Sequence, residues 1–223
     1  MDTRCSLGLQ DYGPASYHGE IGNLINTMRE NGLRTQGQII APSVNADWTP
    51  ENVFDTGFLQ EFSDSLGIIT VEKYNSASAL LITSAKVSSR YPNDNCAAIF
   101  NTGGPIRQPQ DMLAMYLTHA TGANLLQQYL NTARIAQEVG KPFMMFETNT
   151  ASCGGFPGIS DAFVAALWGL DYGLTMAQSN FTGALWHVGG QNVYYNVSCS
   201  PGLGVPNLDV FLPAIHSCAP NKK

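Results

Sequence analysis

The sequence predicts an α/β protein built around a parallel sheet, and two observations lead to this fold class. Short apolar segments alternate along the chain with longer segments of helical spacing, in the order helix and then strand, four times over. The strand segments are continuous apolar runs, which is typical of strands that are covered on both faces. Alternation of helices and strands in this manner favours a parallel sheet with covering helices.

The first half of this pattern contains two helices and two strands. Pro14 to Asn31 has apolar residues at helical spacing. Residues 38–44 form a short apolar strand. Thr49-Pro50-Glu51 is a typical helix start, with threonine as N-cap and proline in the first turn, and it predicts one continuous helix to about Leu66. The next strand is expected over residues 66–71.

The second half repeats the alternation. Asp111 to Gly140 contains two helical stretches, and we expect a break near Thr121-Gly122. A third strand is predicted over residues 142–147, followed by a strongly apolar helix from Ile159 to Gln178. The fourth strand is expected over residues 182–187.

Two architectures are compatible with this order: a doubly wound open sheet and a (β/α)8 barrel. The chain has no Gly-x-Gly-x-x-Gly turn after a strand, which a dinucleotide-binding sheet would carry. Polar residues instead follow the strands, at Tyr74, Glu147 and His187, and barrel enzymes collect catalytic residues at this end of their strands. Since only four strands are predicted, we expect about half of a (β/α)8 TIM barrel.

The composition excludes several classes of protein. The chain of 223 residues has 11 Lys+Arg against 17 Asp+Glu, a formal net charge of −6, and only 13% of its residues are charged. A negative chain without basic clusters has no electrostatic reason to bind nucleic acid or an anionic membrane. The apolar run Ala162–Leu170 is much shorter than the roughly 20 residues that span a bilayer. We expect one domain and a monomer.

The cysteines and histidines do not indicate a metal site or a cofactor. The chain has five cysteines, an odd number, and their spacing does not match zinc motifs. Cys96 and Cys153 are candidates for a disulfide in an oxidising compartment, and free thiols are the alternative. The four histidines are scattered along the chain.

The evidence on cellular location points in two directions. Asn180-Phe-Thr182 and Asn196-Val-Ser198 are acceptor sequences for N-glycosylation, although chance produces such triplets in a chain rich in Asn and Ser. Lys and Arg are sparse, as in many extracellular enzymes. The first residues nevertheless contain no signal peptide. We therefore expect an extracellular protein whose true N-terminus lies outside this sequence.

Glu147 is the most informative residue of the chain. It directly follows the apolar run Phe143-Met-Met-Phe146, so it is expected at the mouth of the sheet, partly removed from water. A carboxylate in that environment can act as a nucleophile or as a base. The alternative is a surface glutamate that opens a loop.

The segments around Glu147 resemble glycoside hydrolase family 79, the β-glucuronidase and heparanase-like family, and its fungal members in particular. The resemblance is strongest over residues 141–161, 165–172 and 180–195, and weaker matches are found at 12–17, 48–58 and 95–100. It implies a retaining glycosidase on a (β/α)8 barrel, of which this chain would supply about strands 5–8. Its substrate would be a carbohydrate that bears terminal β-glucuronic acid.

The resemblance also assigns roles to individual positions. It makes Glu147 the nucleophile and Tyr74 the aromatic residue that steadies it. Four further positions would contact the sugar or its carboxylate: Gly154, Gly155, His187 and Tyr194. Structural roles are open for these residues as well, because a glycine pair can form a turn, a histidine can be bonded within the core and a tyrosine can simply pack.

The acid/base residue of the family has no counterpart at the expected place. An Asn-Glu pair belongs just before the helix at 14–31, and residues 1–11 contain no glutamate. Four other glutamates are candidate substitutes: Glu20, Glu51 and Glu61 in helical segments, and Glu72 near a strand end. Glu72 is disfavoured because adjacent residues of a strand point to opposite sides.

Two more departures concern the organisation of the chain. Residues 75–90, rich in Ser and Ala, resemble a translated intron, and they leave open whether Tyr74 or Tyr91 holds the family position. Residues 197–223 form an irregular tail, and the β-sandwich of the family is absent. We therefore expect a partial catalytic domain over 1–196, truncated and inactive. The alternatives are a non-catalytic carbohydrate-binding remnant and an unrelated α/β protein.

Overall fold

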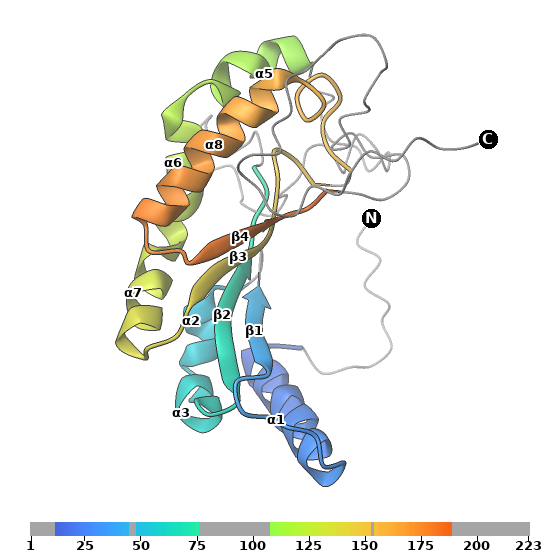
Figure 1. Ribbon diagram of the computed structural model, residues 1–223, viewed down its shortest axis with the longest axis vertical. Helices are drawn as coiled ribbons and strands as arrows, with labels where there is room; N and C mark the ends of the chain where they lie inside the picture. Colours follow the sequence, from blue (N-terminus) through green and yellow to red (C-terminus); the bar gives the residue numbers. More distant parts are fainter. Residues whose placement is uncertain (1–11, 45–47, 76–107, 153, 189–223) are drawn as a thin grey trace, which may run out of the picture.

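A computed structural model describes residues 12–44, 48–75, 108–152 and 154–188. Its centre is a parallel sheet whose neighbouring strands follow the order of the chain (Figure 1). The strands are β1 (Ile39–Val44), β2 (Leu66–Glu72), β3 (Phe143–Thr148) and β4 (Gly183–Trp186). The predicted α/β class and the predicted parallel sheet are confirmed.

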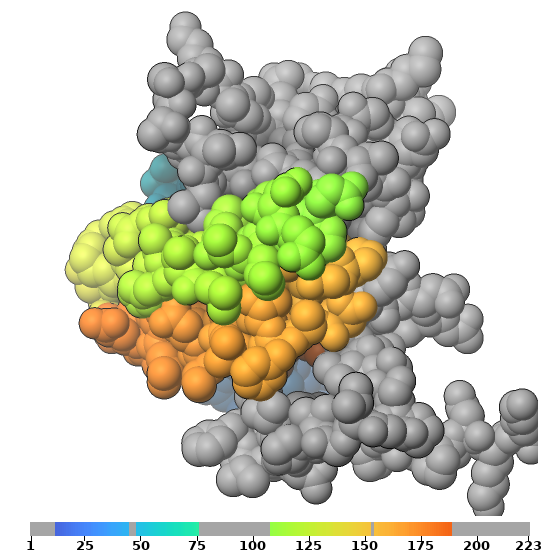
Figure 2. All heavy atoms as spheres, turned by 90° about the horizontal axis from the view of Figure 1, so that it is seen from above, coloured from blue at the N-terminus to red at the C-terminus, as the bar shows by residue number. Residues whose placement is uncertain are grey.

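The helices connect successive strands, as parallel pairing requires. In Figure 1, α1, α2 and α3 lie beside β1 and β2, whereas α5, α6, α7 and α8 lie toward β3 and β4. In Figure 2, α5 and α6 (green) pack side by side with α8 (orange). The bounds are α1 (Pro14–Glu30), α2 (Pro50–Phe54), α3 (Phe58–Phe62), α5 (Pro109–Tyr116), α6 (His119–Leu126), the 3-10 turn η2 (Gln127–Tyr129), α7 (Leu130–Glu138) and α8 (Phe163–Gln178).

The single helix expected from Thr49 to about Leu66 is wrong, because this segment forms the two short helices α2 and α3. Thr49 caps α2 as expected, in a reciprocal arrangement with Asn52. The break lies at Gly57, whose φ of 88° is left-handed. A helix cannot continue through that conformation, and glycine adopts it without steric cost.

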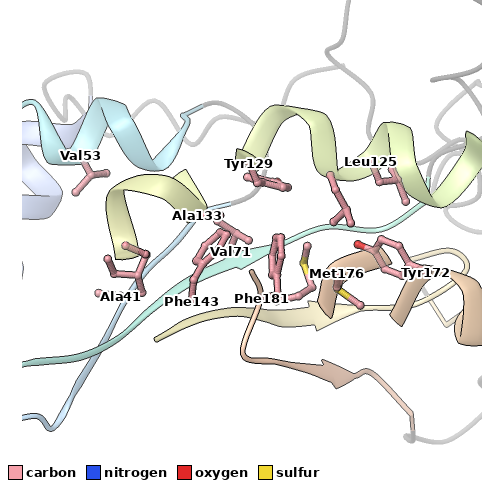
Figure 3. Close-up of a cluster of buried hydrophobic side chains, with 14 of the residues drawn as sticks. Ala41, Val53, Val71, Leu125, Tyr129, Ala133, Phe143, Tyr172, Met176 and Phe181 are labelled. Carbon is pink, nitrogen blue, oxygen red and sulfur yellow. The ribbon is translucent and has the colours of Figure 1, made fainter. Parts of the chain in front are cut away.

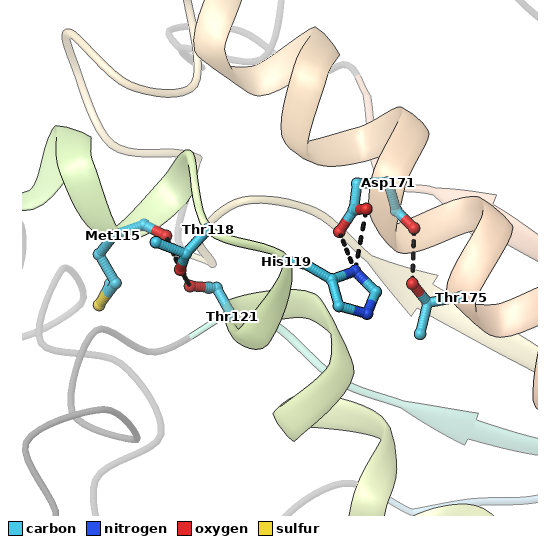
Figure 4. Close-up of polar contacts among 6 residues, drawn as sticks. All are labelled: Met115, Thr118, His119, Thr121, Asp171 and Thr175. Carbon is cyan, nitrogen blue, oxygen red and sulfur yellow. Dashed lines mark hydrogen bonds and ion pairs between the residues drawn. The ribbon is translucent and has the colours of Figure 1, made fainter.

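The break expected near Thr121-Gly122 is also misplaced, since both residues lie inside α6. The chain leaves the helix at Leu117 and Thr118 instead. The hydroxyl groups of Thr118 and Thr121 both donate to the carbonyl oxygen of Met115, at 2.8 and 2.6 Å (Figure 4). Threonine hydroxyls that take up a backbone carbonyl in this manner compete with helix continuation.

The core lies between the sheet and the helices. Figure 3 shows Val71 of β2 and Phe143 of β3 packed with Tyr129 of η2 and Met176 of α8. Further along α8, the ring of Trp168 stacks on Tyr172 with centroids 4.8 Å apart. Burial of such large apolar side chains is the main stabilising contribution to the fold.

Helix α8 is apolar on more than its buried face. Val164, Trp168, Tyr172 and Met176 point into the core. A second apolar row is exposed on the same helix, at Phe163, Leu167, Leu170 and Leu174.

None of the described helices is long and apolar enough to cross a membrane. The predicted insertion after Asn75 and the predicted tail at 197–223 lie outside the described residues.

Candidate functional site

Three of the residues singled out by the sequence meet at the carboxyl end of the sheet. The hydroxyl of Tyr74, just beyond β2, donates to Oε1 of Glu147 at 2.5 Å. Nδ1 of His187, just beyond β4, lies 3.1 Å from the same oxygen. Because strands β2, β3 and β4 are neighbours, their ends bring together residues that are far apart in the sequence. Tyr74, Glu147 and His187 are called the strand-end triad below.

The geometry around Glu147 is asymmetric. Both contacts within the strand-end triad fall on Oε1, and Oε2 has no hydrogen bond from the described residues. The side chain of Glu147 is 39% exposed, and that of His187 is 45% exposed. The contacts from Tyr74 and His187 thus hold one oxygen of the carboxylate. A carboxylate arranged in this manner can attack an electrophilic carbon.

Backbone and side-chain bonds fasten the three strand ends to one another. The backbone N–H of Lys73 donates to the carbonyl of Glu147, and that of His187 donates to the carbonyl of Thr148, each at 2.9 Å. The amide of Asn149 donates to the carbonyl of His187 at 2.8 Å. Asn149 is buried and was not singled out from the sequence. These bonds hold the strand-end triad in place before any ligand binds.

The loop after β3 is shaped by glycines and hydroxyl groups. Gly154 and Gly155 have φ values of 90° and 97°, so they occupy a turn that other residues rarely adopt. The hydroxyls of Thr150 and Ser160 lie 2.6 Å apart, and Ser160 accepts from the N–H of Phe156. This turn delays the start of α8 to Phe163, four residues after the predicted start. The sugar contact of the two glycines stays a prediction.

A second carboxyl group lies beside the strand-end triad. Glu72 is the register partner of Glu147 on β2, and its Oε1 accepts from the hydroxyl of Ser43 at 3.0 Å. Burial raises the pKa of the Glu72 carboxyl, the hydrogen bond from Ser43 lowers it, and the charge of Glu147 raises it further. Glu72 lies two residues before Tyr74, and alternation along an extended chain puts both on one side.

Other expectations find less support within the part of the chain that the structure describes. Tyr194 and Tyr91 lie outside the described residues, so Tyr74 is the tyrosine seen at Glu147. The described ranges contain no group of three or more side chains that could hold a metal ion. Lys73 is the cationic side chain nearest in sequence to the triad, and burial lowers the pKa of its ammonium group.

Comparisons of the sequence identify one distant relative and no family model. No model of a protein family matches the chain. A segment of 96 residues is 30% identical to a β-glucuronidase of Aspergillus niger. This match covers 41% of the chain but only 18% of the curated relative. The sequence similarity is therefore local, and it points to a glycoside hydrolase.

A comparison of the fold agrees with this class. The chain resembles the crystal structure of a 4-O-α-L-rhamnosyl-β-D-glucuronidase from Fusarium oxysporum, with a TM-score of 0.59 and 19% sequence identity. The match covers 82% of this chain and 33% of that structure. The four-stranded sheet is thus consistent with part of a TIM-barrel-like glycosidase fold. The sequence similarity to a β-glucuronidase concerns a local segment, and the structural similarity concerns the fold.

Proposed function

We propose that the chain carries the nucleophile side of a retaining β-glucuronidase-type site and belongs to glycoside hydrolase family 79. The observation that carries this proposal is the strand-end triad, in which Tyr74 and His187 contact one oxygen of the Glu147 carboxylate. In this proposal the four strands are strands 5–8 of a (β/α)8 barrel. The catalytic domain extends over residues 1–196, with 75–90 as an insertion.

The proposed chemistry begins with attack of Glu147 on the anomeric carbon. Oε2 forms a bond to that carbon while the glycosidic C–O bond breaks, and the leaving oxygen takes the bonding electrons and a proton. The product is a glycosyl ester of Glu147. Water then cleaves the ester, so two inversions give net retention. Tyr74 and His187 hold the carboxylate in its attacking orientation throughout.

Retention also needs a second carboxyl group, about 5–5.5 Å from the first, that protonates the leaving group. The family places it in an Asn-Glu pair, and this chain has no such pair. General acid catalysis commonly contributes about 10²–10⁴-fold to such a step. We therefore propose that the chain of 223 residues does not by itself hydrolyse ordinary glycosides, but that its nucleophile reacts when the leaving group needs no proton.

The proposed ligand is a carbohydrate with a terminal glucuronic acid. Its carboxylate would be bound by Tyr194 and by backbone N–H groups near Gly154 and Gly155, with His187 at the sugar site. Neutral hydrogen-bond donors can bind a carboxylate well, and bonds to a charged acceptor are stronger than neutral ones. No metal or cofactor is needed for this chemistry. The proposed setting is extracellular, with the chain acting as a monomer.

A burst experiment tests the proposal on the full chain of 223 residues. A dinitrophenyl β-glucuronide releases its phenolate without protonation, so wild type should release close to one equivalent of phenolate per active chain. Glu147→Gln should release none. Glu30→Gln, at the exposed end of α1, is the matched control and should behave as wild type. An equal burst from Glu147→Gln would contradict the assignment.

The same material tests the binding alternative. Calorimetry with glucuronic acid measures binding without chemistry. Saturable binding by wild type, without a burst from the activated glycoside, would favour a non-catalytic carbohydrate-binding protein over the proposed reaction.

A further inference from the structure

Glu72 is a second carboxyl group beside the strand-end triad, and the proposed reaction assigns it no role. It ends β2 and pairs in register with Glu147 on β3, and neighbouring strands of a sheet lie about 4.8 Å apart. Its side chain is half-buried. A glutamate side chain at this position lies next to the nucleophile, although 75 residues separate the two in the sequence.

Ser43 holds this carboxyl from the neighbouring strand. Its φ of 50° is left-handed, which is uncommon for a residue other than glycine. The hydroxyl donates to Oε1 of Glu72 at 3.0 Å. Non-glycine residues in this conformation are enriched at functional sites, where surrounding contacts maintain them. The hydrogen bond from Ser43 therefore holds the carboxyl group of Glu72 in a defined position beside the strand-end triad.

The groups around Glu72 are mainly acidic or neutral. From β3 it faces Glu147, whose charge raises the pKa of Glu72. From η2, the hydroxyl of Tyr129 donates to the backbone carbonyl of Glu72 at 3.4 Å. On its own strand it is followed by Lys73, whose pKa is lowered by burial, and by Tyr74. His187 lies beyond Glu147, just past the end of β4, with its Nδ1 3.1 Å from Oε1 of Glu147.

We propose that Glu72 determines the charge selectivity of the site, excluding anionic sugars when it is ionised and admitting them when it is protonated. This inference rests on the proposed function, since it concerns a sugar that approaches Glu147. When both glutamates are ionised, a uronate meets two negative charges at the strand ends. Protonation of Glu72 leaves Glu147 as the remaining carboxylate of this pair. The site then accepts a uronate best at acidic pH.

The raised pKa agrees with this role, because it extends the protonated state of Glu72 above the usual range for a glutamate. The pairwise effect is modest. One charge at a partly exposed site is expected to change binding roughly three- to tenfold. That effect is large enough to measure as a ratio of rates.

The test compares an anionic and a neutral reagent on the same protein. The reagents are 2-deoxy-2-fluoro-β-D-glucuronyl fluoride and its glucosyl counterpart, which both label a carboxylate nucleophile without a proton donor. The second-order labelling rate of the full chain is measured from pH 4 to 8 for each, and the ratio of anionic to neutral reagent is plotted. Variants are Glu72→Gln, the control Glu30→Gln, and both in a His187→Gln background, which removes the imidazole that contacts Glu147.

In wild type and Glu30→Gln the ratio should fall about three- to tenfold as pH rises. In Glu72→Gln the ratio should stay constant at the value that wild type has at acidic pH. At pH 7 this variant should therefore react faster with the anionic reagent, relative to the neutral one, than wild type does. Gln retains an oxygen that can accept from Ser43, so the packing is preserved. A merely structural role for Glu72 would lower both rates together and leave the ratio unchanged.

A ratio in Glu72→Gln that follows wild type over the whole pH range would overturn the inference while leaving the proposed function intact. Absence of labelling of wild type by both reagents would instead refute the proposed function. In that event the carbon-13 titration of the Glu72 carboxyl decides the charge coupling by itself. Its pKa should fall when Glu147 is replaced by Gln, and an unchanged pKa would overturn the coupling.

Discussion

The hydroxyl of Tyr74 lies 2.5 Å from Oε1 of Glu147, although 73 positions separate the two residues in the chain. The contact joins the ends of two neighbouring parallel strands. It fixes one oxygen of the carboxylate, Oε1. This relationship is the structural basis of the proposed nucleophile, and the first prediction concerns it directly.

Tyr74→Phe removes the hydroxyl and keeps the ring. Since a hydrogen bond to a charged group contributes about 1.5–3 kcal/mol, the labelling rate of Glu147 should fall roughly 10- to 100-fold. Tyr12→Phe is the matched control, because that hydroxyl donates to Glu20 on the exposed side of α1. Equal rates in the two variants would show that Tyr74 has no part in holding the nucleophile.

His187→Gln should have a smaller effect than Tyr74→Phe. The contact of Nδ1 with Glu147 is longer, at 3.1 Å, and the histidine is 45% exposed, so solvent can replace part of it. We expect a fall in the labelling rate of about three- to tenfold. The control is His119→Gln, because His119 pairs with Asp171 between α6 and α8 (Figure 4). That exposed pair should contribute less than about 1 kcal/mol to stability and nothing to labelling. Loss of labelling in the control would contradict the placement of the site.

Glu72→Gln should change stability in a manner that depends on pH. The pKa of Glu72 is raised in the folded protein, so ionisation of this group opposes folding as pH rises through that pKa. At a pH below the ordinary pKa range of a glutamate, Glu72 is neutral in both the folded and the unfolded state. Wild type and Glu72→Gln should then unfold at the same temperature. At pH 7 the variant should unfold at a higher temperature than wild type. A lower unfolding temperature at pH 7 would contradict the assigned burial and charge coupling.

Ser43→Ala tests the other half of this pair. The hydrogen bond from Ser43 lowers the pKa of Glu72, so its removal should raise that pKa further. The carbon-13 titration of the Glu72 carboxyl measures the shift. A downward shift would mean that the hydroxyl does not stabilise the ionised carboxylate.

The two apolar faces of α8 should differ sharply in their contribution to stability. Trp168 is 2% exposed and stacks on Tyr172, so Trp168→Ala should cost about 3–5 kcal/mol. Leu170 is 63% exposed, and Leu170→Ala should change stability by less than about 0.5 kcal/mol. Urea denaturation measures both variants. A large loss in Leu170→Ala would show that the exposed row of α8 is covered in the folded protein.

The four strands could be located from the sequence because each is a continuous apolar run. All four agree with the structure to within one or two residues. The helix interruptions could not be located in the same manner. They depend on local conformations, the left-handed Gly57 and the hydroxyl bonds of Thr118 and Thr121 to Met115, and the apolar spacing runs through both without a signal.

Only part of the candidate site could be predicted from the sequence. Glu147 and His187 follow apolar strands directly, and Tyr74 follows the strand before them. The contributions of Glu72, Ser43 and Asn149 depend on the register between strands and on backbone conformation, which a sequence pattern does not contain. Asn149, two residues after Glu147, carries a weak signal, because a buried amide at a strand end usually satisfies backbone groups.

The most direct test of the central claim is the site of covalent labelling. The full chain is incubated with 2-deoxy-2-fluoro-β-D-glucuronyl fluoride, digested with a protease and analysed by mass spectrometry. The account predicts one added sugar per chain, attached to Glu147 within the peptide that follows Lys141, and no addition in Glu147→Gln. An unlabelled wild-type chain, or a sugar attached to a different carboxylate, would contradict it.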